Sequence, residues 1–121
     1  MPFRHVVMFK WNEGLDPAHV DTVRDRLSEL PMHIGQIRSY THGPDVGVSE
    51  GNFDFAVVAD FDNVNDWRIY RDHPLHVLFV EEMIKGYVAN RAAVQFNIGP
   101  SGRRGSSAGI EELLAEFDEL G

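Results

Sequence analysis

Residues 3–11 read Phe3-Arg4-His5-Val6-Val7-Met8-Phe9-Lys10-Trp11, and this stretch decides the fold. Its side chains alternate with a period of two, which predicts a β-strand. The odd positions are aromatic or apolar except for His5, while the even positions are apolar at the centre, at Val6 and Met8. A strand with one wet face would carry polar residues there, so we expect both faces of this strand to be covered.

Two helical regions are expected after this strand. Asp16 caps a helix that has a proline at its first position, and Pro31 is expected to end it. Later in the chain, Asn63 or Asn65 caps a short helical segment, after which Pro74 begins the next helix.

Three further strands complete the pattern. Residues 34–42 are a weaker strand candidate, residues 53–61 alternate clearly, and residues 88–98 form the last strand. The predicted order is therefore β-α-β-β-α-β. This order indicates an α+β ferredoxin-like fold, in which a four-stranded antiparallel sheet carries two helices on one face.

The other face of such a sheet has no helix to cover it. Val6 and Met8 from the first strand and Ala56 and Val58 from the third would lie on that face. The same face of a second copy is the simplest cover, because a two-fold dimer needs only self-complementarity. The sequence therefore predicts a homodimer through these residues.

Composition narrows the classes of partner. The chain has 121 residues and a net charge of −8, which argues for one core domain and against nucleic acid as a partner. No apolar run is long enough to span a membrane, and the start does not resemble a signal peptide, so we expect a cytoplasmic protein. Its zero cysteines exclude thiolate chemistry and disulfides.

The end of the chain has a different character. Residues 1–99 form the predicted domain, and residues 100–109 have the glycine, serine and proline content of a linker. Residues 110–121 place apolar side chains at helical spacing between acidic ones, which predicts an amphipathic helix. Its acidic face argues against an anionic membrane surface.

Side chains that could take part in catalysis are concentrated in residues 70–76. Pro74 places His73 at a helix cap and His76 on the first turn, where outward N–H groups disfavour an imidazolium. Because Phe79 and other apolar residues neighbour His76, we expect a neutral ring in an apolar pocket. A neutral histidine can serve as a base, and the Tyr70 hydroxyl can donate to a carbonyl oxygen. His5 projects from the first strand toward the same pocket.

Other interpretations of these residues stay open. A His-Pro helix start is common capping chemistry, and a tyrosine or histidine at a core edge is often only hydrogen-bonded. Metal binding through His73, His76 and His5 lacks an obvious carboxylate ligand, so we expect neither a metal nor another cofactor.

Three motifs stand out: His5-Val6-Val7-Met8-Phe9-Lys10, Asp54-Phe55-Ala56-Val57-Val58 and Tyr70-x-x-His73-Pro74-x-His76-x-x-Phe79. Together they resemble the stress-responsive A/B barrel (Dabb) domain family over about residues 2–98. This resemblance implies the dimeric α+β barrel, in which two ferredoxin-like units press their sheets together.

The resemblance extends to plant polyketide cyclases of the olivetolic acid cyclase kind, which perform an intramolecular aldol condensation without a metal or organic cofactor. The tyrosine and second histidine of the motif are catalytic there. This implies that His76 is the base and that Tyr70 orients or polarises a substrate carbonyl. The ligand-binding residues that the resemblance implies are His5, Val7, Phe9, His73 and Phe79.

Three hypotheses about function follow. The first is a cofactor-independent cyclase, lyase or isomerase that acts on a small apolar or carbonyl-containing ligand in an apolar cleft. The second is a non-catalytic stress-response or assembly protein in which the Tyr-x-x-His-Pro-x-His motif is structural. The third is a cofactor-free monooxygenase, which no residue demands.

Overall fold

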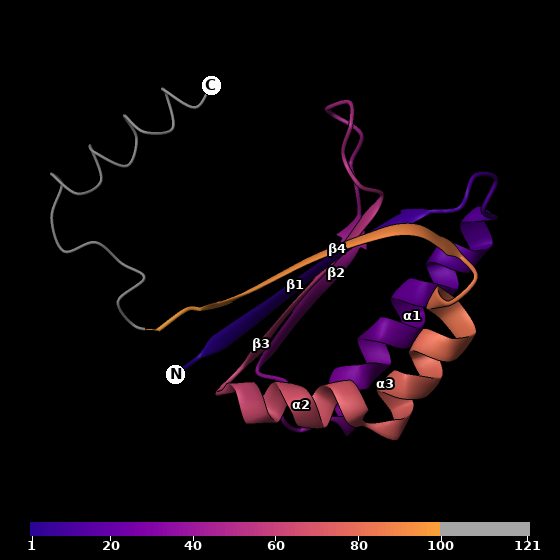
Figure 1. Ribbon diagram of the computed structural model, residues 1–121. Helices are drawn as coiled ribbons and strands as arrows, with labels where there is room; N and C mark the ends of the chain where they lie inside the picture. The colour runs from indigo at the N-terminus through magenta and orange to yellow at the C-terminus, as the bar shows by residue number, and fades with distance from the viewer. Residues whose placement is uncertain (100–121) are drawn as a thin grey trace, which may run out of the picture.

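A four-stranded antiparallel sheet organises the computed structural model, which describes residues 1–99 (Figure 1). The strand order is β2-β3-β1-β4. The strands are β1 (Phe3–Trp11), β2 (Ser39–Pro44), β3 (Phe55–Phe61) and β4 (Val88–Asn97). This order confirms the predicted ferredoxin-like fold, while the predicted linker and tail helix lie outside the described residues.

The helices all lie on one side of the sheet (Figure 1). They are α1 (Pro17–His33), α2 (Val64–Asp72) and α3 (Pro74–Phe79), followed by the short π-helix η1 (Val80–Ile84). The Asp16 carboxylate accepts a bond from the N–H of Ala18 at 2.9 Å, and the Asn63 side chain accepts one from the N–H of Asp66 at 2.8 Å. Both caps satisfy N–H groups that the helix leaves unpaired.

The prediction that Pro31 ends the first helix was wrong. The helix continues to His33, and the N–H of Ile34 donates to the carbonyl of Leu30 at 2.9 Å. Pro31 lies in the last turn, where its missing N–H removes only one helical bond. Continuing the turn buries Ile34, whose side chain is only 1% exposed, and the second strand consequently begins later than predicted, at Ser39.

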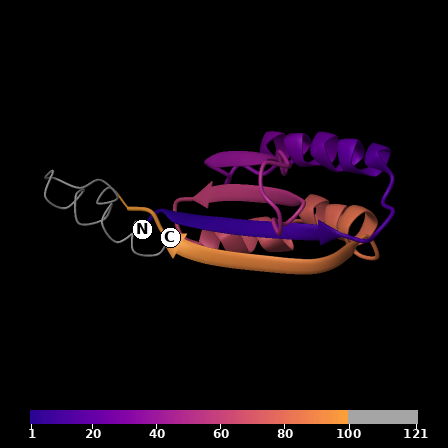
Figure 2. The same ribbon diagram turned by 90° about the horizontal axis from the view of Figure 1, so that it is seen from above.

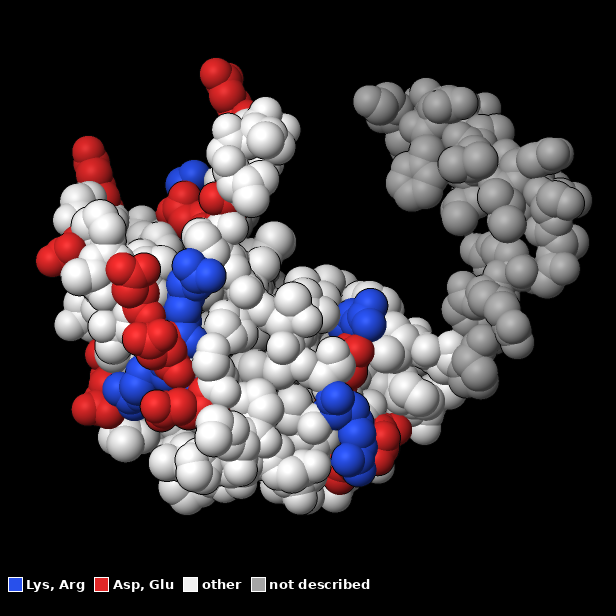
Figure 3. All heavy atoms as spheres, turned by 180° about the vertical axis from the view of Figure 1, so that it is seen from behind, with Lys and Arg blue, Asp and Glu red and all other residues white. Residues whose placement is uncertain are grey.

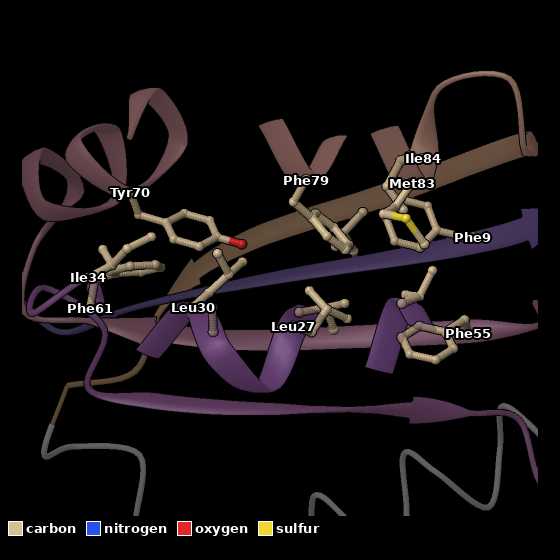
Figure 4. Packing of buried hydrophobic residues seen from close by; sticks show 14 of the residues in the cluster. Phe9, Leu27, Leu30, Ile34, Phe55, Phe61, Tyr70, Phe79, Met83 and Ile84 are labelled. Atoms are coloured by element: carbon tan, nitrogen blue, oxygen red, sulfur yellow. The ribbon is translucent and has the colours of Figure 1, made fainter. Parts of the chain in front are cut away.

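The core lies between the sheet and the helices. Phe55 and Phe61 from β3 are each 1% exposed, and they pack with side chains from α1 (Figure 4). The largest fully buried side chains are Phe55, Phe61, Leu27, Ile34 and Val23. Large apolar side chains buried in this way supply most of the stabilisation of a small domain.

Among residues 1–99, no helix lies on the opposite face of the sheet (Figure 2). Val6, Met8, Ala56 and Val58 are half-buried there within one chain. In β4, Val94 is paired with Val6 and Phe96 with Arg4, so both lie on this face, where they are 56% and 44% exposed. The face is therefore more apolar than predicted, because β4 adds to it. Among residues 1–99, no helix is long and apolar enough to cross a membrane.

Candidate active site

A cavity of about 770 Å³ lies between the helices and the half of the sheet formed by β1 and β4. Sites for small molecules typically enclose about 300–1,000 Å³. The cavity exists because Arg91, Ala93 and Gln95 of β4 face the helices without being packed beneath them. The predicted site residues that line it are His5, Val7, Phe9, Tyr70, His76 and Phe79.

His73 is the predicted site residue that the structure places elsewhere. Its Nδ1 accepts a bond from the N–H of Leu75 at 3.1 Å, so it caps α3 just before Pro74. It is not part of the cavity lining. Within residues 1–99, no group of three or more histidine, cysteine or acidic side chains is arranged to hold a metal ion.

His76 lies at the inner wall of the cavity. Its Nδ1–H donates to the carbonyl of Arg71 at 2.9 Å, an arrangement that assigns the proton of the neutral ring to Nδ1. Nε2 then holds a free lone pair. Burial is the main cause that lowers the pKa of His76 below its ordinary value of 6.5, so the ring is neutral near pH 7.

Tyr70 packs beside His76, with 4.3 Å between the ring centroids. Its hydroxyl lies 2.7 Å from the hydroxyl of Tyr40 on β2. Burial raises the pKa of Tyr70 to about 12 and raises the pKa of Tyr40 as well. Both groups are therefore neutral hydroxyls. When Tyr40 donates to Tyr70, the proton of Tyr70 is available to a ligand in the cavity.

His5 is the third polar group in this part of the cavity. The side-chain amide of Gln95 donates to its Nδ1 at 3.0 Å, which assigns the proton of the neutral ring to Nε2. Burial, then the charge of Arg91, and then His76 lower the pKa of His5 to about 4. His5 thus stays neutral and can donate through Nε2. Its ring centroid is 5.8 Å from that of Trp67.

Sequence reasoning missed Tyr40, Gln95, Arg91 and Trp67 as cavity residues. The alternation of the last strand does place Arg91 and Gln95 on a common side, opposite the apolar residues Ala92 and Val94. If the apolar side is assigned to the uncovered sheet face, Arg91 and Gln95 must lie on the side that faces the helices. No comparable signal exists for Tyr40, because its bond to Tyr70 joins residues 30 positions apart.

Known proteins support the same fold. A family model described as Stress responsive A/B Barrel Domain matches residues 3–98. A solved structure from Thermobifida fusca, described as a dimeric ferredoxin-like protein of unknown function, is 42% identical and has a TM-score of 0.76. That match covers 81% of this chain and 92% of the other. No curated protein matches the chain.

Two more distant structures show the fold alone. A hydroxynitrile lyase from Passiflora edulis is 17% identical with a TM-score of 0.72, and the match covers 82% of this chain and 94% of the lyase. SnoaB, a cofactor-independent oxygenase from Streptomyces nogalater, is 11% identical with a TM-score of 0.64. That match covers 81% of this chain and 93% of SnoaB.

Proposed function

This chain belongs to the stress-responsive A/B barrel domain family, and on that premise we propose that it is a cofactor-independent cyclase, lyase or isomerase. Its reaction would begin with removal of a proton from the carbon next to a carbonyl. The observation that carries the proposal is the hydrogen bond from His76 to the Arg71 carbonyl, because it leaves Nε2 free in the cavity beside Tyr70.

The proposed step balances within the cavity. His76 Nε2 takes the proton from carbon, and the electrons of the C–H bond move toward the carbonyl oxygen to form an enolate. Tyr70 Oη–H and His5 Nε2–H can both donate to that oxygen as its negative charge grows. The imidazolium of His76 later returns a proton to carbon or to the product.

The site favours this hypothesis over the two alternatives. A hydroxynitrile lyase and a cofactor-independent oxygenase share the fold, so the fold by itself does not choose the chemistry. The capping role of His73 supports a structural purpose for that one residue of the motif. His76 and Tyr70 face the cavity, and capping does not explain their placement. The cytoplasmic location stays a prediction.

Deuterium exchange tests the proton abstraction without knowledge of the natural substrate. Propiophenone, an apolar aryl ketone, is incubated with the protein in heavy water, and loss of the protons next to its carbonyl is followed by proton NMR. His76→Asn keeps a donor for the Arg71 carbonyl but removes the base, so we expect exchange to slow at least about 100-fold. Tyr70→Phe should slow it as well, because an oxyanion donor is lost.

The matched control is His73→Asn, which preserves a capping side chain outside the cavity. We expect this variant to exchange protons like the wild type. Because the pKa of His76 lies below 6.5, the wild-type rate should fall only in buffers more acidic than that value. Equal exchange by wild type and a folded His76→Asn variant would remove the assigned role.

We also propose that the chain forms a homodimer through the uncovered sheet face. The dimeric state of the similar Thermobifida fusca protein supports this, as do the exposed Val94 and Phe96. Sedimentation of the wild type should give a dimer, and Val58→Asp should give a folded monomer because it places a charge in the buried face. A wild-type monomer in dilute buffer would contradict the proposal.

A further inference from the structure

The cavity differs in charge from the rest of the molecule. The chain has 19 acidic and 11 basic residues, and acidic side chains gather on the side of the molecule where α1 lies (Figure 3). Among residues 1–99, no acidic residue lines the cavity. The lining includes the three cations Arg71, Lys85 and Arg91. The described lining of the cavity therefore carries no negative charge, although the protein is acidic overall.

The three cations are not equivalent. Arg71 forms a two-point ion pair with Asp72, at 2.8 and 3.0 Å, and lies over the ring of Trp67. Lys85 is paired with Glu81. Arg91 forms no ion pair with any residue in the described part of the chain. Within residues 1–99, its guanidinium is therefore the cavity cation without an ion-pair partner.

The register of the sheet fixes where Arg91 lies relative to the polar groups. Arg91 is paired with Phe9, and Gln95, four residues along β4, is paired with His5. This separation is roughly 13 Å between backbone positions, part of which the long arginine side chain can span. The influence of Arg91 on the pKa of His5 agrees with a guanidinium that extends toward that end.

Apolar side chains line the cavity between these two ends. Val7 and Ala93 belong to the sheet, where they are paired with each other, and Phe79 and Val80 come from the helical side. Such walls suit an aromatic or aliphatic body and offer no hydrogen bond along its length.

We propose that the ligand is an oxo acid: an apolar molecule whose carbonyl and carboxylate are separated by an apolar linker. Arg91 holds the carboxylate, and the carbonyl lies at Tyr70, His5 and His76. The position of the carbonyl rests on the proposed function, while the carboxylate site rests on Arg91 and on the absence of acidic side chains in the described lining.

A matched pair of ligands tests the charge requirement. Benzoylpropionate and its neutral amide differ only in the group that would meet Arg91. Each is titrated into the protein and followed by the fluorescence of Trp67, which lines the cavity. We expect the acid to bind about tenfold or more tightly than the amide, since hydrogen bonds to charged groups are the stronger ones.

Arg91→Gln should remove this preference, because the affinity for the acid should fall much more than the affinity for the amide. The control Arg68→Gln removes an exposed arginine of α2 that does not line the cavity, and it should keep the preference. Thermal unfolding verifies that both variants are folded. Equal binding of acid and amide by the wild type, or an unchanged preference in Arg91→Gln, overturns the inference.

Deuterium exchange into benzoylpropionate separates this inference from the proposed function. If the acid binds with the Arg91-dependent preference but wild type and His76→Asn exchange it equally, the ligand class stands and the proposed proton abstraction fails. If exchange depends on His76 while binding ignores Arg91, the proposed function stands and the oxo acid is wrong.

Discussion

The two strands that flank β1 present opposite environments to the same side of the sheet. Phe9 is paired with Phe55 of β3 on one side and with Arg91 of β4 on the other. Phe55 is 1% exposed, whereas Arg91 is exposed. The same contrast repeats along β1, where His5 lies between Ala59 and Gln95.

The closed half, over β2 and β3, is filled by α1 and its neighbours and stabilises the fold. The open half, over β1 and β4, leaves the cavity, and its polar side chains are arranged around that space. A packed interior has no room for a ligand, so the packed core is centred on β3 and the exposed cavity lining on β4. Substitutions at matched positions in the closed half and the open half test this difference.

The largest effect is expected where the two halves flank Phe9. Phe55→Ala should lower the free energy of unfolding by about 3–5 kcal/mol, because it leaves a cavity in the core. Arg91→Ala, on the other side of Phe9, should change it by no more than about 0.5 kcal/mol. Urea denaturation measures both. Similar losses in the two variants would show that the open half also supports the fold.

A second pair of substitutions enlarges a side chain instead of truncating one. Ala59→Leu inserts atoms at a side chain that is 0% exposed, and we expect a loss of about 1–3 kcal/mol from overpacking. Ala93→Leu makes the same change in the cavity lining and should leave stability within about 0.5 kcal/mol. It should also weaken binding of benzoylpropionate. A stable Ala59→Leu variant would argue against tight packing in the closed half.

Acidic pH should destabilise the protein through His5, which lies on β1 between the closed half and the open half. The pKa of His5 falls from 6.5 to about 4 on folding, so below pH 6.5 the unfolded chain binds a proton that the native chain does not. Stability should therefore fall as the pH drops from 6.5 toward 4, by at most about 1.4 kcal/mol per pH unit from this group. The pKa values of His42 and His76 are also lowered and act in the same direction.

The contribution of His5 is isolated by comparing wild type with His5→Gln over this pH range. The difference between their unfolding free energies should shrink as the pH falls. A constant difference would mean that His5 titrates alike in the folded and unfolded chains.

The smallest expected effect concerns the tyrosine pair. Tyr40→Phe leaves the buried hydroxyl of Tyr70 without its partner, which should cost about 1–2 kcal/mol in denaturant unfolding. Tyr87→Phe, at a ring that is 37% exposed, is the matched control and should be nearly neutral. If Tyr40→Phe and the control behave alike, the hydroxyl pair does not hold Tyr70 in position.

Much of the fold could be predicted because its signals are local. Period-two alternation predicted β1 and β3, Asp16 predicted the start of α1, and Pro74 predicted the beginning of α3. For α2 the sequence offered Asn63 or Asn65 as the cap, and the structure has Asn63. The end of α1 was missed because burial of Ile34 outweighed the effect of Pro31 in the last turn. Local preferences give way where tertiary packing provides more free energy.

The candidate site was predictable only in part, for a related reason. The segment containing Tyr70 and His76 was visible as a motif. His73 caps α3, as its place before Pro74 predicts, but it does not line the cavity as the resemblance implies. Arg91 and Gln95 belong to β4. The two sides of this strand differ in polarity, but the sequence does not indicate which side faces the helices.

Neighbours along the chain set the order of strands and helices, the two-sided character of β1 and the capping of α1 and α3, so the sequence alone predicts these features. The side of β4 that faces the cavity is set by the tertiary structure alone. The same holds for the hydrogen bonds between Tyr40 and Tyr70 and between Gln95 and His5. Strand pairing sets these contacts, and a shift of one residue would turn every side chain of β4 to the other face.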